Sequence, residues 1–184
     1  MRVISGTAKG RKLQSVPGDQ TRPITDRVKE ALFDIIGPDV VGSTWWDMFA
    51  GTGAVGIEAL SRGATFARLT DLNRAPLETI KGNLARTGLS AHAEVRRADA
   101  FALLAAAPDR QFDYIYIAPP QYKQLWQRAL HALDGNHGWL DRDGWVVVQL
   151  DPKEYELQAL ANLKEFNTRR YGTTLLVFYV RGDS

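Results

Sequence analysis

A glycine-rich segment at residues 47–56, Asp-Met-Phe-Ala-Gly-Thr-Gly-Ala-Val-Gly, constrains the fold of this chain more than any other feature. The apolar run Thr44–Phe49 leads into it, and a helical pattern over Ala54–Arg62 follows. Glycines spaced as Gly-x-Gly-x-x-Gly between a strand and a helix let the backbone approach a bound ligand closely. The segment therefore predicts an α/β protein with a ligand site beyond the carboxyl end of this strand.

The rest of the chain continues this alternation of strands and helices. Further strands are expected at Phe66–Thr70, Ala93–Arg97, Tyr114–Ile117 and Trp145–Leu150, and helices at Ala75–Thr87, Phe101–Ala107 and Gln121–Leu133. Such alternation predicts a mostly parallel sheet covered on both faces. A helix over Glu154–Asn162 is expected next, and the strands Lys164–Arg170 and Thr173–Val180 are close enough to form an antiparallel hairpin. We expect at least one residue of the pair Trp45-Trp46 to lie in the core.

The first 37 residues differ from the rest in charge. Residues 1–30 hold seven Lys or Arg and three acidic residues, whereas the other 154 residues hold sixteen and eighteen. A basic arm on a near-neutral body is typical of a protein with a polyanionic partner, and a merely solvated arm fits equally well. The candidate residues for contact with such a partner are Arg2, Lys9, Arg11, Lys12, Arg22 and Arg27.

Local patterns suggest how this N-terminal segment folds. Arg2–Ile4 and Lys12–Gln14 predict a small hairpin. Apolar residues at helical spacing from Val28 to Ile36 predict a helix, which Thr25 or Asp26 can cap and Gly37-Pro38 ends.

Composition excludes several classes of site. The chain has no cysteine, so disulfides and thiolate metal sites are excluded, and its three histidines lack ligand spacing, so we expect no metal. It has no apolar run of about 18 residues and no signal-peptide pattern, so we expect a cytoplasmic protein without membrane contact. We also expect a monomer.

The acid that precedes the glycines decides between two ligands. The pyrophosphate of a nicotinamide or flavin cofactor would be repelled by Asp47, because it binds where the helix N-terminus favours negative charge. S-adenosylmethionine carries an ammonium and a sulfonium and no phosphate, so Asp47 would attract it. Asp71 follows the next strand, where a ribose-binding acid belongs. Asp99 can accept from an adenine amino group, cap the helix after it, or do both. The sequence favours the methyl donor and leaves a nicotinamide oxidoreductase as an alternative.

Several segments resemble the RsmD family, the 16S rRNA guanine-N2 methyltransferases of the guanine 966 type. They are Arg2–Gly6, Gly10–Leu13, Thr21–Phe33, Asp47–Ala64, Asp99-Ala100 and Phe112-Asp113. The resemblance covers nearly the whole chain and implies a Rossmann-like class I S-adenosylmethionine-dependent methyltransferase, with a seven-stranded, mostly parallel sheet and an antiparallel last strand. It also implies two parts, an N-terminal basic hairpin arm with the first helix at 1–37 and a Rossmann-like methyltransferase domain at 38–184.

The resemblance assigns the cofactor site. Asp47, Gly51 and Gly53 would line the methionine end of S-adenosylmethionine, Asp71 would bind the ribose although the family usually has Glu there, and Asp99 would meet the adenine. The candidate cofactor-binding residues are Asp47, Phe49, Gly51, Gly53, Asp71, Asp99 and Ala100. The implied partner is 16S rRNA or an assembly intermediate of the small ribosomal subunit.

The catalytic motif departs from the family pattern. Where the family has Asp-Pro-Pro followed by Phe or Tyr, this chain has Ala118-Pro119-Pro120-Gln121, followed by Tyr122. In the usual motif the Asp carboxylate and the first proline's carbonyl accept the two hydrogens of the target amine, and the aromatic ring stacks on the base. Here Gln121 is a candidate acceptor and Tyr122 a candidate ring. The departure leaves a catalytically lapsed RNA-binding relative as another alternative.

Overall fold

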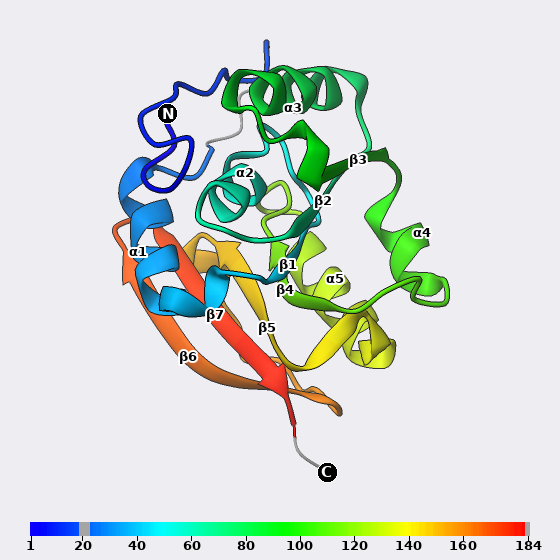
Figure 1. Cartoon of the computed structure of the whole chain (residues 1–184). Coiled ribbons are helices and arrows are strands. Elements are labelled where there is room, and N and C mark those ends of the chain that lie inside the picture. Colours follow the sequence, from blue (N-terminus) through cyan, green and yellow to red (C-terminus); the bar gives the residue numbers. More distant parts are fainter. Residues whose placement is uncertain (19–22, 183–184) are drawn as a thin grey trace.

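The computed structural model describes residues 1–18 and 23–182, and a seven-stranded sheet lies at its centre (Figure 1). The strands are β1 (Thr44–Asp47), β2 (Phe66–Asp71), β3 (Ala93–Arg97), β4 (Phe112–Ile117), β5 (Leu140–Leu150), β6 (Leu163–Tyr171) and β7 (Thr174–Arg181). The helices are α1 (Asp26–Ile36), α2 (Ala54–Ser61), α3 (Arg74–Thr87), α4 (Ala100–Ala105) and α5 (Leu125–Gly135).

The strand order in the sheet is β3-β2-β1-β4-β5-β7-β6. The pairs from β3 to β5 are parallel, and β7 is antiparallel to both β5 and β6. The strand order reverses at β1, because β2 and β3 lie on one side of it and β4 and β5 on the other. The crevice at such a switch point is where ligands bind in open α/β sheets. The expected topology, including the antiparallel last strand, is confirmed.

Helices cover both faces of the sheet. Residues of α1, α2 and α3 form one core with one face, and residues of α4 and α5 form a second core with the other. Successive strand residues point to opposite faces, so Trp45 belongs to the first core and Trp46 to the second, and neither is exposed. Both tryptophans are therefore core residues, which agrees with the expectation that at least one of them would be.

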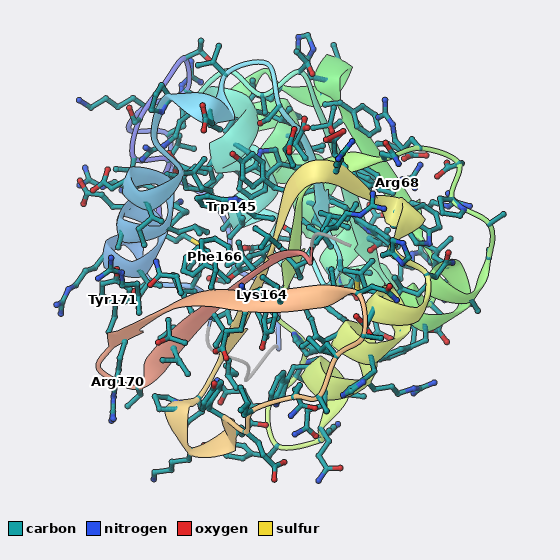
Figure 2. The ribbon with its side chains drawn as sticks, turned by 90° about the horizontal axis from the view of Figure 1, so that it is seen from below. Arg68, Trp145, Lys164, Phe166, Arg170 and Tyr171 are labelled. Atoms are coloured by element: carbon teal, nitrogen blue, oxygen red, sulfur yellow. The ribbon has the colours of Figure 1, made fainter. Side chains whose placement is uncertain are left out.

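The edge strand β6 carries aromatic side chains on the face that α1 shares. Phe166 lies in an irregularity of the β6–β7 register and is 41% exposed. Its ring packs against that of Trp145, with 5.1 Å between the ring centroids (Figure 2). It also lies 6.0 Å from the ring of Phe178. These rings extend the first core along β5, β7 and β6.

The helix expected over Glu154–Asn162 is absent, and this prediction was wrong. Only Pro152–Glu154 forms a short 3-10 turn, and an irregular segment leads to β6. This connection runs from the carboxyl end of β5 to the amino end of β6, about 30 Å for a nine-residue strand. A helix advances only about 1.5 Å per residue, so it cannot span that length. Asp134 instead accepts from the N–H groups of Ala161, Asn162 and Leu163.

Other differences are smaller. The helix expected from Gln121 begins at Leu125, because Tyr122 and Gln124 adopt positive φ values of 63° and 56°. The strand expected from Trp145 begins earlier, at Leu140. The N-terminal hairpin is reduced to one antiparallel bridge between Arg2 and Lys12. The helix α1 begins as expected, since the Thr25 side chain accepts from the N–H of Val28. Among the helices of the described residues, none is long and apolar enough to cross a membrane.

Candidate active site

A cavity of about 1050 Å³ lies beyond the carboxyl ends of β1, β2 and β4. It contains most of the residues that the sequence nominated for cofactor and catalysis: Asp47, Phe49, Gly51, Asp71, Asp99, Ala100, Ala118, Pro119, Pro120 and Gln121. The two nominated groups therefore line a single space, as transfer between two bound molecules requires.

Asp47 ends β1 and is 2% exposed. Its Oδ2 accepts a hydrogen bond of 3.2 Å from the N–H of Gly56 in α2. Burial raises the pKa of Asp47 to about 7, the Gly56 bond opposes this rise, and the nearby Asp71 adds to it. A buried carboxylate of this kind favours a cation in the cavity.

The three glycines of the loop are required for different structural reasons. Gly51 and Gly53 both have positive φ, 57° and 80°, which non-glycine residues rarely adopt. A Cβ atom at Gly51 would meet nothing within 4 Å, so this glycine leaves open space against the cavity. A Cβ at Gly53 would lie 3.1 Å from Leu69, and one at Gly56 only 2.9 Å from the same side chain. Gly51 therefore faces the ligand space, whereas Gly53 and Gly56 allow α2 to pack closely on β2.

The other two acids already hold backbone groups. Asp71 at the end of β2 accepts from the N–H groups of Gly51 and Asn73, at 3.2 and 3.1 Å. Asp99 caps α4 by accepting from the N–H of Phe101 at 2.9 Å. A carboxylate has about four lone-pair sites, so both acids retain capacity for a ligand. The expected helix-capping role of Asp99 is confirmed, and its adenine contact stays a prediction.

The segment after β4 differs from the expected arrangement at Tyr122. Ala118, Pro119, Pro120 and Gln121 line the cavity, but Tyr122 is not among its lining residues and is 64% exposed. Its hydroxyl donates to Asp151 at 2.5 Å and its N–H donates to Glu154 at 2.7 Å. Tyr122 thus ties the catalytic segment to the chain after β5.

Several cavity residues were missed by sequence reasoning. Lys123 and Arg128 bring positive charge to the cavity, and the Arg128 guanidinium lies 3.8 Å above the ring of Phe101. Tyr116 and Gln149 also line the cavity. The signal for Gln149 was a single polar residue in the apolar strand Val146-Val147-Val148-Gln149-Leu150, at the strand end that faces the ligand.

The N-terminal arm also reaches this cavity. Val16, Pro17, Gly18, Pro23 and Ile24 line it. The buried side chain of Asn83 in α3 donates to the carbonyls of Gln14 and Thr52, at 3.1 and 3.0 Å. One amide therefore connects the arm to the glycine loop.

A buried carboxylate, Glu58 in α2, fixes the start of the arm. Its two oxygens accept from the N–H groups of Ile4 and Ser5, at 2.9 and 3.1 Å. Gly6 then passes so close to α2 that a Cβ there would lie 1.8 Å from the Ser61 carbonyl oxygen. The arm is docked on the body (Figure 1), and its side chains Val3, Ala8, Leu13 and Val16 are buried.

The nominated RNA-binding residues lie on this docked arm and on α1. Arg2, Lys9, Arg11, Lys12 and Arg27 are exposed, while Arg22 lies outside the described residues. Arg2 pairs weakly with Asp26 at 3.8 Å, and Arg11 donates to the carbonyl of Arg86. Among the described residues, no group of three or more His, Asp or Glu side chains is placed to hold a metal ion.

Known proteins resemble this chain over most of its length. The family model described as Conserved hypothetical protein 95 matches residues 1–180. A Bacillus subtilis protein named as an rRNA methyltransferase, YlbH, is 42% identical over 182 residues, 97% of this chain and 98% of that protein. Ribosomal RNA small subunit methyltransferase D of Escherichia coli is 36% identical over 149 residues, 81% of this chain and 74% of that protein. The chain belongs to the RsmD family.

A solved structure supports the same membership. An Escherichia coli protein named as a methyltransferase, yhhF, matches this RsmD-family chain with a TM-score of 0.86 and 34% identity, over 100% of this chain and 99% of that one. The expected Rossmann-like fold, the S-adenosylmethionine-dependent methyltransferase class and its cofactor are confirmed. The RsmD relatives favour neither the nicotinamide oxidoreductase nor the catalytically lapsed protein.

Proposed function

We propose that this protein transfers a methyl group from S-adenosylmethionine to the exocyclic N2 amine of a guanine in 16S rRNA. The observation that carries the proposal is the cavity, which is lined by a buried acid, the glycine loop, the Ala118-Pro119-Pro120 segment and part of the docked basic arm. When bound, S-adenosylmethionine supplies an electrophilic methyl group on a sulfonium. The protein's own residues bind and align the donor and the target base and exclude water from the cavity.

The donor end of the cavity fits this molecule. Asp47 is the group that would hold its ammonium, because a buried carboxylate gains most from a positive partner. The open space at Gly51 gives room for close approach to the backbone. Asp71 and Asp99 would accept from ribose hydroxyls and from the adenine amino group, respectively.

The acceptor end is where the target guanine would be aligned. An arylamine is a weak nucleophile because its lone pair is delocalised into the ring. The Pro119 carbonyl would accept one hydrogen of the amine, which helps the nitrogen become pyramidal. A base is extruded from its stack to enter such a pocket.

The nucleic acid would lie along the basic residues around the cavity. Lys9, Arg11 and Lys12 on the arm, with Lys123 and Arg128 at the cavity, are suited to phosphate contacts. We propose a small-subunit assembly intermediate as the natural partner, a monomeric enzyme, and a cytoplasmic location. The names of the curated relatives support a ribosomal RNA substrate.

A tritium-transfer assay tests the proposal directly. Unmodified small-subunit rRNA and assembling subunits are incubated with the protein and labelled donor, and the modified nucleotide is mapped. We expect label in N2-methylguanine at one position. Label on another base, or on no RNA while the folded protein binds the donor, would refute the proposed function.

A further inference from the structure

The chain lacks the carboxylate that its family uses after strand β4, and the adjacent strand supplies a polar group at the same level. Ile117 of β4 and Val148 of β5 are register partners in a parallel pair. The next residues are Ala118 and Gln149, which therefore stand side by side where the two strands reach the cavity. Ala118 contributes only a methyl group there, so it leaves room for a neighbour.

Gln149 also projects to the correct face. Partners in a parallel pair share a face, and alternate residues of a strand do too. Tyr116 is a register partner of both Asp47 and Val147, and it lies in the same core as Ala118. Asp47, Tyr116, Ala118 and Gln149 thus belong to one face at the carboxyl ends of three adjacent strands, β1, β4 and β5.

A buried phenol holds the Gln149 amide in place. Tyr116 is 3% exposed, and its hydroxyl donates to Oε1 of Gln149. An amide oxygen has two lone pairs, so Oε1 can accept a second hydrogen bond from the cavity side. Gln121, the acceptor suggested by the sequence, also lines the cavity and is exposed on the segment after β4.

We propose that Oε1 of Gln149 accepts a hydrogen bond from the target amine, in place of the carboxylate that Ala118 lacks, with Tyr116 as the residue that positions it. This inference rests on the proposed function. In the transfer the amine nitrogen bonds to the methyl carbon while the carbon–sulfur bond breaks, its electron pair stays on sulfur, and the nitrogen then releases a proton to solvent. Gln149 remains a neutral acceptor and takes no proton.

The first test measures binding without the donor. An RNA carrying the mapped guanine is compared with the same RNA carrying inosine, which lacks only the amine, by fluorescence anisotropy. We expect the wild-type protein to prefer guanine by about ten-fold and Gln149→Leu to lower that preference several-fold, because the Pro119 carbonyl still accepts the other hydrogen of the amine. Gln127→Leu is the matched control, because Gln127 contacts Glu156 outside the cavity.

The second test uses single-turnover rates. Gln149→Leu should lower the rate by about ten-fold or more, and adding Ala118→Asp should restore most of that activity. Because Gln149→Leu leaves the buried Tyr116 hydroxyl without a hydrogen-bond partner, the double variant Tyr116→Phe/Gln149→Leu, which lacks that hydroxyl, serves as a second test. Melting curves and donor calorimetry verify that each variant is folded.

Three outcomes separate the possibilities. A Gln149→Leu protein that prefers guanine as strongly as the wild type overturns this inference alone, provided that the wild-type protein methylates the RNA. Loss of the preference in Gln121→Leu, with Gln149→Leu unaffected, also overturns it and assigns the acceptor to Gln121. A wild-type protein that methylates no guanine refutes the proposed function and this inference together.

Discussion

The Nζ atom of Lys29 lies 3.2 Å from Oε1 of Glu58, and neither side chain is exposed to solvent. Lys29 also donates to the carbonyl of Arg2 at 2.6 Å, and Glu58 pairs with Arg62 at 2.8 Å. Burial lowers the pKa of Lys29, and the adjacent Glu58 opposes that change. This ion pair joins α1, α2 and the N-terminal arm, so it positions the segment that borders the cavity.

Glu58→Gln should therefore destabilise the protein. The substitution leaves the Lys29 ammonium buried without its charged partner, which typically costs about 3–5 kcal/mol of unfolding free energy. Urea unfolding measures the change. The double variant Lys29→Met/Glu58→Gln should be destabilised much less than Glu58→Gln alone, because the fully buried ammonium is gone and only the partly exposed Arg62 loses its charged partner. Equal stability of Glu58→Gln and wild type would mean that the pair does not hold the arm.

Donor affinity should depend on pH through Asp47. A cationic donor prefers the ionised carboxylate, and the pKa of Asp47 is raised to about 7 in the folded protein. Affinity for S-adenosylmethionine should therefore fall as pH decreases through about 7, by at most about ten-fold per pH unit. Calorimetry from about pH 5.5 to about pH 8.5 tests this across the titration of the carboxyl. Asp47→Asn should bind more weakly than wild type at the alkaline end of this range, and its affinity should vary less with pH.

The same group should affect the stability of the donor-free protein with the opposite trend. The ordinary pKa of this carboxyl is 3.8, so between about pH 4 and 7 the folded state binds more protons at Asp47 than the unfolded state. Its contribution to stability is present below this window and is lost as pH rises through it. As pH rises over that range, the free energy of unfolding of Asp47→Asn should increase relative to that of the wild type, because Asn does not ionise. A constant difference would contradict the raised pKa.

The docked arm should bind RNA through its exposed side chains. Replacing Lys9, Arg11 and Lys12 with Gln should weaken RNA binding and reduce the slope of log K against log salt by about 0.7–0.9 for each phosphate that is no longer neutralised. The control triple variant changes Lys164, Arg169 and Arg170, which are exposed on the edge strand β6 (Figure 2 labels the first and last). Identical salt slopes for the arm variant and wild type would show that the arm is only solvated.

Tyr122→Phe can separate two roles for this residue. A ring that stacks on the guanine would survive the change to Phe, whereas a hydroxyl that anchors the segment to Asp151 would be removed. We expect Tyr122→Phe to lower turnover several-fold with donor affinity unchanged, and Asp151→Asn to have a similar effect, since one surface hydrogen bond contributes about 1 kcal/mol. Full turnover in Tyr122→Phe with a severe decrease in Tyr122→Ala would support stacking instead.

The sequence by itself predicted most of the order of elements and nominated the residues of the proposed donor end. Glycines at a strand-to-helix turn permit positive φ and close approach of a ligand, and an acid before that turn repels phosphate in any tertiary setting, so Asp47, Gly51 and Asp71 could be nominated from the local sequence. Alternation of strands and helices likewise predicts a parallel sheet without knowledge of distant contacts.

Only the tertiary structure decided the acceptor end. Whether Gln149 stands beside Ala118 depends on the register between two strands that are far apart in the sequence, and no local pattern specifies that register. The position of Tyr122 outside the cavity depends on bonds to Asp151 and Glu154, and the helical pattern of Glu154–Asn162 was overridden by the length that the β5–β6 connection must span. Local propensity is worth fractions of a kcal/mol per residue, so long-range pairing and chain geometry prevailed at these positions.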